Sequence, residues 1–401
     1  MDNDIIESAR AQKDEMANLL AKIISIKAIS PLQGGNGELE RAEYIKKILE
    51  NMALKVEEYY YKDETNVIRP NLITKFGNNK RTIWLVTHLD TVAEGDLSLW
   101  SFDPFKGIIK DGKVYGRGSV DNGHSLVASI YALKLLKEKN KKLKYNIGIA
   151  LVADEENGSK YGIQKLLEEN IFQKGDMFLV PDWGNGKSDK IEIAEKGILW
   201  LKITILGKQC HASTPDKGIN AYRYSIRFLQ KADEILHKKY NKINLIFDPN
   251  YSTFEMTKHE KNLENVNIIP GKEITYIDCR ILPDYKIDNI IADLEDLSKS
   301  EEFKEVKIYF EFLQKEEAAA TEKDAEIINL LKKIIKEQYN VDSTEIGIGG
   351  GTCAGFFRRK GFDAIAWSTS NDDEQAHQPN EYTIIDSMVN DAITFAHLYI
   401  I

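Results

Sequence analysis

Asn146-Ile-Gly-Ile-Ala-Leu-Val152 is the stretch that decides the fold, because it is a continuous apolar run that does not alternate with polar residues. Such runs are typical of strands that are covered on both faces of a sheet. Thr82-Ile-Trp-Leu-Val-Thr87 and Met177-Phe-Leu-Val180 have the same character. A helix is expected after Asp121, where four apolar residues share one helical face: Leu126, Ile130, Leu133 and Leu136. Buried strands that alternate with helices predict an α/β layer with much parallel pairing.

The pattern of apolar and polar residues changes near residue 197. Leu199–Ile205, Glu273–Ile281 and Val306–Phe312 alternate apolar and polar residues, which indicates an antiparallel sheet with one solvent-exposed face. Helical segments at about 219–239 and 286–300 complete an α+β unit. We therefore expect an α/β domain from residues 1–196 and 316–401, interrupted by an inserted α+β domain at 197–315.

Bulk properties exclude several classes of protein. A chain of 401 residues is long for one core, so two domains are expected. The net charge of −9 without a long basic run argues against a nucleic-acid partner. No apolar run reaches the roughly 18 residues of a membrane span, and the N-terminus lacks a signal-peptide pattern. The three scattered cysteines, Cys210, Cys279 and Cys353, form neither a disulfide framework nor a metal motif, so a cytoplasmic location is expected.

Acidic residues follow the predicted buried strands. His88 and Asp90 come two residues apart after the first strand, so their side chains share a face of an extended backbone. Asp154, Glu155 and Glu156 follow Val152, where ionised carboxylates are costly unless they are paired or bound to metal. A helix N-terminus that favours acidic residues explains one of these three acids well and all three poorly.

Three further candidates complete a set of possible metal ligands. Asp121 lies in a glycine-rich turn, Asp182 ends an apolar strand, and His377 lies in a polar loop near the C-terminus. Each of them alone is more often a solvated loop residue. Together with His88 and the acidic segment they form an oxygen–nitrogen donor set that suits Zn, Co or Mn.

The order of these motifs, HxD, GRGxxD, DEE, D and H, resembles the co-catalytic zinc hydrolase family of succinyl-diaminopimelate desuccinylase, acetylornithine deacetylase, glutamate carboxypeptidase, aminoacylase and carnosinase. The resemblance covers nearly the whole chain. It implies a dinuclear-zinc aminopeptidase-like α/β catalytic domain with an inserted α+β, ferredoxin-like lid and dimerisation domain. It further implies two divalent metal ions: Asp121 would bridge them, His88 and Asp182 would complete one site, and Glu156 and His377 the other.

The same resemblance implies the catalytic residues. Glu155 would be the general acid/base, and Asp90 would support His88. The family also leads us to expect a cis peptide bond between Asp121 and Asn122.

The inserted segment resembles the family's lid. His211 would reach the active site of a neighbouring subunit as an oxyanion donor, which implies a homodimer. Asn267 would contact the substrate carbonyl, and Arg280 would bind a substrate carboxylate. The glycine-rich segment Ile348–Thr352, with Gly350 and Thr352, would close on that carboxylate.

The expected reaction is metal-assisted hydrolysis of an amide bond in a small N-acyl amino acid, as in a desuccinylase or deacetylase. A dipeptidase or aminopeptidase that acts on free-amine peptides is an open alternative, because Asp182 stands where relatives acting on acylated amines often carry Glu. A non-catalytic binding relative and a dinuclear phosphoesterase are more remote alternatives.

Overall fold

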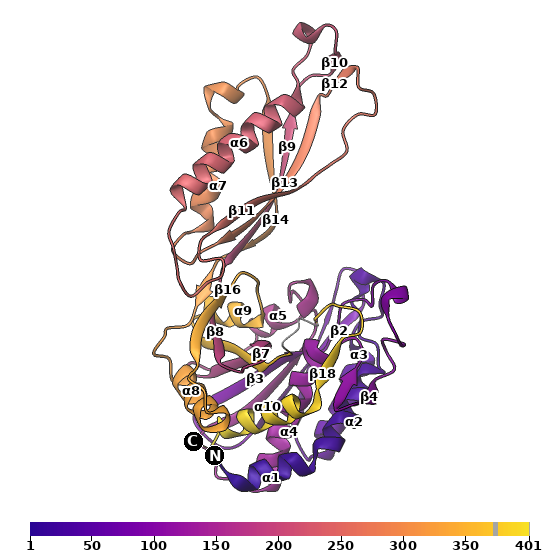
Figure 1. Ribbon diagram of the computed structural model, residues 1–401, viewed down its shortest axis with the longest axis vertical. Coiled ribbons are helices and arrows are strands. Elements are labelled where there is room, and N and C mark those ends of the chain that lie inside the picture. Colours follow the sequence, from indigo (N-terminus) through magenta and orange to yellow (C-terminus); the bar gives the residue numbers. More distant parts are fainter. Residues whose placement is uncertain (372–375, 401) are drawn as a thin grey trace. The chain divides into compact units, whose positions relative to one another are not determined.

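The computed structural model describes residues 1–371 and 376–400 (Figure 1). The chain divides into two compact units. The first unit contains residues 1–193, 321–346 and 352–401, and the second contains residues 194–320 and 347–351. The second unit thus includes Gly347–Gly351, which the sequence analysis assigned to the C-terminal part of the α/β domain.

A mixed sheet forms the centre of the first unit, in the order β1-β2-β6-β3-β7-β17-β8. The four middle strands, β6, β3, β7 and β17, run parallel, and the pairings β1–β2, β2–β6 and β17–β8 are antiparallel. The strands are β1 (Val56–Lys62), β2 (Ile68–Phe76), β3 (Thr82–His88), β6 (Asn146–Val152), β7 (Met177–Asn185), β8 (Lys190–Glu195) and β17 (Asp363–Thr369). All residues of β3 and β6 are buried, as their apolar runs predict.

Helices cover both faces of this sheet (Figure 1). One face packs on α5 (Ile163–Leu166) and α9 (Cys353–Arg359). On the opposite side α4 (Ser125–Glu138) and α10 (Ile385–His397) contact the strands and each other. The remaining helices are α1 (Asn3–Ala11), α2 (Lys13–Ile24), α3 (Leu39–Asn51) and α8 (Glu326–Tyr339), and the short strands β4 (Ile108–Lys110), β5 (Lys113–Tyr115) and β18 (Tyr382–Ile384) form a separate sheet. β16 (Thr344–Ile348) pairs with β8.

The second unit is a four-stranded antiparallel sheet in the order β11-β13-β9-β14. Its elements are β9 (Gly197–Leu206), α6 (Ala221–Lys239), β11 (Thr253–His259), β13 (Lys272–Ile281), α7 (Ile287–Ser298) and β14 (Lys307–Glu316), with the short strands β10 (Cys210–His211), β12 (Ile268–Ile269) and β15 (Ala319–Ala320). The succession β-α-β-β-α-β is the ferredoxin-like arrangement. Leu199, Leu201, Ile203 and Ile205 of β9 pack in the core with α6 and α7, whereas Trp200 is 40% exposed.

The predicted fold class is confirmed: an α/β layer with both faces covered is accompanied by an α+β, ferredoxin-like unit. The apolar runs became the parallel strands, and the alternating segments became the sheet with one open face. Among residues 1–371 and 376–400, no helix is long and apolar enough to cross a membrane.

A substitution at Gly148 tests how tightly β6 packs against Trp84 of the neighbouring strand β3. A Cβ atom at this position of β6 would lie 2.2 Å from the indole ring of Trp84 in β3. That ring is buried, and its Nε1 donates a hydrogen bond to Asp176 Oδ2 over 2.9 Å, so it cannot easily move. We expect Gly148→Ala to lower the free energy of unfolding by about 1–3 kcal/mol, measured by urea denaturation.

Gly349→Ala is the matched control for this substitution, because its Cβ would meet no atom within 4 Å. Its effect on the free energy of unfolding should stay within about 0.5 kcal/mol. A Gly148→Ala variant as stable as this control would disprove the packing argument.

Candidate metal centre

The candidate ligands gather at the carboxyl ends of the parallel strands, where open α/β sheets place their sites. His88 is the last residue of β3, and Glu155 and Glu156 follow β6. Asp182 lies near the end of β7, and His377 follows β17. Asp121 comes from the turn before α4, and the peptide bond that joins it to Asn122 is cis.

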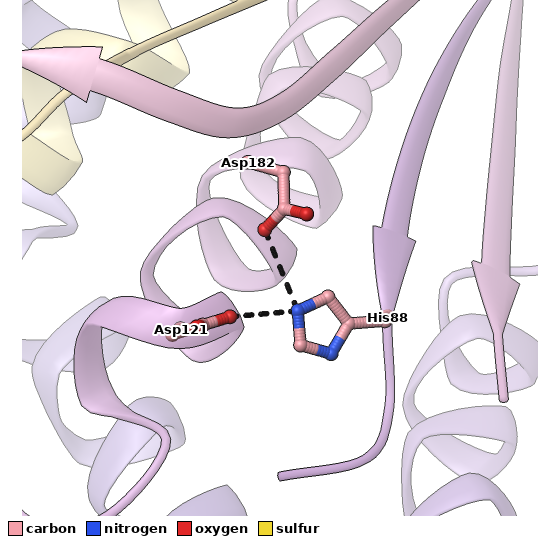
Figure 2. Close-up of side chains that lie close together, drawn as sticks. All are labelled: His88, Asp121 and Asp182. Atoms are coloured by element: carbon pink, nitrogen blue, oxygen red, sulfur yellow. Dashed lines mark hydrogen bonds and ion pairs between the residues drawn. The ribbon is translucent and has the colours of Figure 1, made fainter. Parts of the chain in front are cut away.

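The first group of possible ligands consists of His88, Asp121 and Asp182. Figure 2 shows the His88 ring pointing one nitrogen toward both carboxylates. His88 Nε2 lies 2.8 Å from Asp121 Oδ1 and 3.4 Å from Asp182 Oδ1. The other ring nitrogen, Nδ1, lies 3.0 Å from the backbone oxygen of Asp90, so Nε2 is left for a ligand role.

The second group consists of Asp121, Glu156 and His377. His377 Nε2 lies 3.1 Å from Asp121 Oδ2 and 3.2 Å from Glu156 Oε2. Asp121 therefore belongs to both groups, with Oδ1 facing His88 and Oδ2 facing His377. All five residues that the sequence analysis named as metal ligands are brought together, and the carboxylate of Asp121 lies between the two histidines.

The charges of this cluster fit divalent cations. Burial disfavours a charged His88, but the carboxylates of Asp182 and Asp121 raise its pKa well above the usual value. Hydrogen bonds to Asp121 and Glu156 raise the pKa of His377 to about 10. The three carboxylates thus favour positive charge near the two histidine rings. The donor set, two imidazoles and three carboxylates, is one that Zn²⁺ and similar cations accept.

Glu155, unlike its neighbour Glu156, is not part of a candidate ligand group. Burial and the negative charge of Asp182 raise the pKa of Glu155 well above its ordinary value. Within the described part of the chain, its carboxylate has no side-chain hydrogen bond, and it belongs to neither ligand group. A carboxylate placed in this way is able to accept and return a proton.

Asp90 holds the turn that carries both glutamates. Its carboxylate, which is fully buried, accepts hydrogen bonds from the backbone N–H groups of Glu155 and Glu156, both over 3.1 Å. The sequence analysis expected this carboxylate to orient His88. In the structure two Asp90 atoms lie near His88 Nδ1: the backbone oxygen at 3.0 Å and the carboxylate Oδ1 at 3.5 Å.

Asp154, the first of the three consecutive acids, points away from the ligand groups. Its Oδ1 lies 3.1 Å from the buried Arg69 guanidinium, which also forms two hydrogen bonds with Glu38. Asp154 Oδ2 accepts a hydrogen bond from the backbone N–H of Tyr161 over 3.0 Å. Asp154 thus stabilises the turn through Arg69 and Tyr161. This gives the first of the three acids after β6 a structural role.

Two residues near the centre were missed by the sequence analysis. Asn122 Nδ2 donates hydrogen bonds to Asp182 Oδ1 over 2.6 Å and to the backbone oxygen of Pro181 over 3.1 Å, so it orients a candidate ligand. Glu381 is fully buried and accepts hydrogen bonds from the turn that holds Asp121. The only local signal for Glu381 was its place four residues after His377.

A cavity of about 650 Å³ adjoins the ligand groups within the first unit. Asp121, Asn122 and Asp182 line one part of it, and residues 183–187 and Ser368 line another. This volume suits a small molecule.

In the second unit, His211 and Asn267 lie side by side at one end of the sheet. His211 pairs with Ile268 in the β10–β12 ladder, and the N–H of Ala212 donates to the backbone oxygen of Asn267 over 2.9 Å. The backbone N–H of Ser213 donates to His211 Nδ1 over 3.1 Å. The Ser213 hydroxyl lies 2.7 Å from the same nitrogen. With Nδ1 as the acceptor of the Ser213 N–H, the neutral ring carries its proton on Nε2, which is then a hydrogen-bond donor.

Arg280 and Gly350 lie together elsewhere in the second unit. Arg280 Nη1 donates to the backbone oxygen of Gly349 over 3.0 Å, and Asp278 holds the guanidinium through Nε over 2.7 Å. Arg280 lies near the end of β13, whereas Asn267 directly precedes β12, on the side of the chain where β13 begins. Thr352, in the first unit, accepts a hydrogen bond from the N–H of Ala354 at the start of α9.

Comparisons with known proteins identify the family. The family model described as peptidase family M20/M25/M40 matches residues 84–400. An uncharacterized metallohydrolase of Methanocaldococcus jannaschii is 43% identical over 406 residues, covering 95% of this chain and 98% of the relative. The succinyl-diaminopimelate desuccinylase of Nautilia profundicola is 26% identical over 376 residues, covering 91% and 93%.

The fold is shared with solved structures. The crystal structure of human carnosine dipeptidase 1 superimposes with a TM-score of 0.71 at 16% sequence identity, covering 99% of this chain and 98% of that one. The family match and the 43% identity extend over most of the chain, and the structure holds candidate groups for two metal ions. The protein therefore belongs to peptidase family M20/M25/M40 and is a metal-dependent hydrolase that acts on amide bonds.

Proposed function

We propose that this hydrolase cleaves the amide bond of a small N-acyl amino acid, in the manner of a desuccinylase or deacetylase. The observation that carries the proposal is the position of Asp121, whose two carboxylate oxygens face His88 and His377 separately. The similarity to succinyl-diaminopimelate desuccinylase, at 26% identity over most of both chains, supports the N-acyl substrate class.

Two divalent metal ions are the proposed cofactors, with Zn as the first choice and Co or Mn as substitutes. His88, Asp121 and Asp182 would hold one ion, and Asp121, Glu156 and His377 the other. Such a pair polarises a carbonyl and lowers the pKa of an attacking water toward about 7. The protein provides the fixed carboxylates and imidazoles around it.

Glu155 is the proposed general acid/base. It lies beside both ligand groups without belonging to either of them. It would take a proton from the attacking water and later deliver that proton to the leaving amine. Asp90 keeps the glutamate in place by binding the backbone of its turn.

In this proposal the second unit holds no candidate metal ligand and instead supplies side chains that bind the substrate. Arg280 presents a guanidinium, which matches a carboxylate with two parallel hydrogen bonds. Its orientation is set by Asp278 and by the backbone oxygen of Gly349. Gly350 leaves room beside it, since no side chain projects from that position. We propose that Arg280 and Gly350 receive the substrate carboxylate.

His211 and Asn267 are proposed to act on the active site of a partner subunit. From Lys272 to Arg280 strand β13 spans eight residue steps, or about 27 Å at the rise of an antiparallel strand. A small amino-acid derivative is shorter than this distance. One substrate therefore cannot contact both ends of the sheet in the same chain. This favours a homodimer in which the Nε2–H group of His211 donates a hydrogen bond to the oxyanion of the neighbouring site.

A dipeptidase acting on free-amine peptides is the second candidate. The short side chain of Asp182, held by Asn122 over 2.6 Å, leaves more room beside the ligand group than a glutamate would. The fold likeness to human carnosine dipeptidase 1 is compatible with this candidate as well.

A substrate panel separates these candidates. We expect the protein to lose activity when a chelator removes metal and to regain it with Zn²⁺ or Co²⁺ at two ions per chain. N-succinyl and N-acetyl amino acids should then be hydrolysed faster than free dipeptides, as measured by the release of amine. Faster hydrolysis of dipeptides would favour the second candidate, and turnover of p-nitrophenyl phosphate alone would point to a phosphoesterase.

Glu155→Ala should lower kcat by about 10²- to 10⁴-fold, because it removes the proton carrier. Its metal content, measured by elemental analysis, should stay at the wild-type level because Glu155 lies outside both ligand groups. Glu168→Ala, which removes an exposed glutamate of the same unit, serves as the control and should keep full activity. Normal turnover by Glu155→Ala would refute the assignment of Glu155.

Mixing two inactive variants tests whether His211 acts across the dimer. In a hybrid dimer, the His211→Ala subunit keeps its own Glu155 and receives an intact His211 from the Glu155→Ala subunit. One of the two sites is therefore complete. Random exchange makes half of the dimers hybrids, so about a quarter of the wild-type activity should return. If His211 serves its own chain, the mixture will stay as inactive as its components.

A further inference from the structure

Glu381 binds the turn that carries Asp121. Its carboxylate accepts hydrogen bonds from three backbone N–H groups: from Gly118 over 3.1 Å, from Val120 over 2.9 Å and from Asp121 itself over 3.3 Å. The side chain is fully buried. Three N–H groups that converge on one carboxylate fix the path of the turn, since each of them would otherwise be a buried donor without a partner.

Arg117 extends this contact to the segment of His377. Its Nη1 lies 2.7 Å from Glu381 Oε2. The same guanidinium donates to the backbone oxygens of His377, over 3.3 Å, and of Gln378, over 3.4 Å. Arg117 and Glu381 therefore link two segments that are more than 250 residues apart in the sequence and that each carry a candidate ligand.

The two ligand groups depend on this link to different degrees. In the first group, His88 is held by strand β3 and by the backbone oxygen of Asp90, and Asp182 is held by Asn122. In the second group, His377 lies in a loop, has a backbone φ of 62°, and has a half-exposed side chain. The segment of His377 is tied to the Asp121 turn through Arg117 and Glu381.

We propose that Glu381 is a positioning residue that holds the Asp121 turn against His377 and thereby sets the affinity of the second cation, the one bound by Asp121, Glu156 and His377. This inference rests on the proposed two-cation function. Residues of this kind, which orient a ligand without touching the metal, commonly contribute about 10- to 100-fold to metal affinity.

Glu381→Gln is the most direct change, because it keeps the shape of the side chain. Both carboxylate oxygens of Glu381 face donors: Oε1 receives the N–H groups of Val120 and Asp121, and Oε2 receives Gly118 and Arg117. An amide has one oxygen and one NH₂ group. One pair of donors would therefore face another donor, and the turn would lose part of its anchor.

The test is a titration of metal-free protein with Co²⁺. Binding is monitored through the visible absorption of the bound ion and by calorimetry. In the wild type we expect two binding steps. In Glu381→Gln the first step should be nearly unchanged, while the second should weaken about 10- to 100-fold. Circular dichroism and thermal unfolding of the same samples report whether the variant is folded.

Glu192→Gln is the matched control. Glu192 is another fully buried glutamate, and its oxygens accept hydrogen bonds from Arg358 over 2.7 and 2.6 Å. Glu192 lies in β8 and Arg358 in α9, and neither element carries a candidate metal ligand. This variant should lose stability and keep both cation affinities.

The outcomes divide clearly. An unchanged second step in Glu381→Gln, equal weakening of both steps, or the same loss in Glu192→Gln would overturn the inference. If Glu381→Gln does not fold, Arg117→Lys replaces it. Arg117 uses Nη1 for Glu381 and Nη2 for the backbone oxygen of His377, and a lysine lacks this planar fork of two nitrogens. Arg117→Lys too should weaken the second step selectively. A wild type that binds no second Co²⁺ would instead refute the proposed function.

Discussion

Several carboxylates that repel one another are held together at one edge of the central sheet. Asp121, Glu156 and Asp182 approach two imidazoles within 2.8 to 3.4 Å, and Glu155 stands beside them. Like charges so close together in a partly buried site are costly unless positive charge lies between them. The chain therefore has to hold these groups in place against their own repulsion, and the hydrolase chemistry depends on that arrangement.

Buried carboxylates that bind backbone N–H groups provide much of this rigidity. Asp90 accepts two N–H groups from the turn of Glu155 and Glu156, and Glu381 accepts three from the turn of Asp121. Both turns are loops at strand or helix ends, where regular secondary structure does not determine the path of the backbone. A carboxylate with several N–H partners fixes such a loop, and it leaves the side chains of the loop free to face the cations.

The sequence predicted the parts of this arrangement that depend on local pattern. The apolar runs before His88 and Glu155 identified the parallel strands, and the acids at their ends identified the candidate ligands. What it did not predict depends on contacts between distant segments. Glu381 was given no role because its partners are about 260 residues away in the sequence. The role of Asp154 within the acidic segment depends on its link to Arg69, which is visible only in the folded chain.

The candidate metal ligands and the residues proposed to recognise the substrate lie in different units of the chain. All five candidate ligands and Glu155 lie in the first unit, whereas Arg280 and His211 lie in the second. The hydrogen bonds that orient Arg280, to Asp278 and Gly349, lie within the second unit as well. Under the proposed function, a substitution there would alter which substrate is recognised without disturbing the carboxylates at the sheet edge. The same proposal assigns the choice of substrate to the second unit and to the cavity beside Asp182, and the hydrolysis itself to the groups of the first unit.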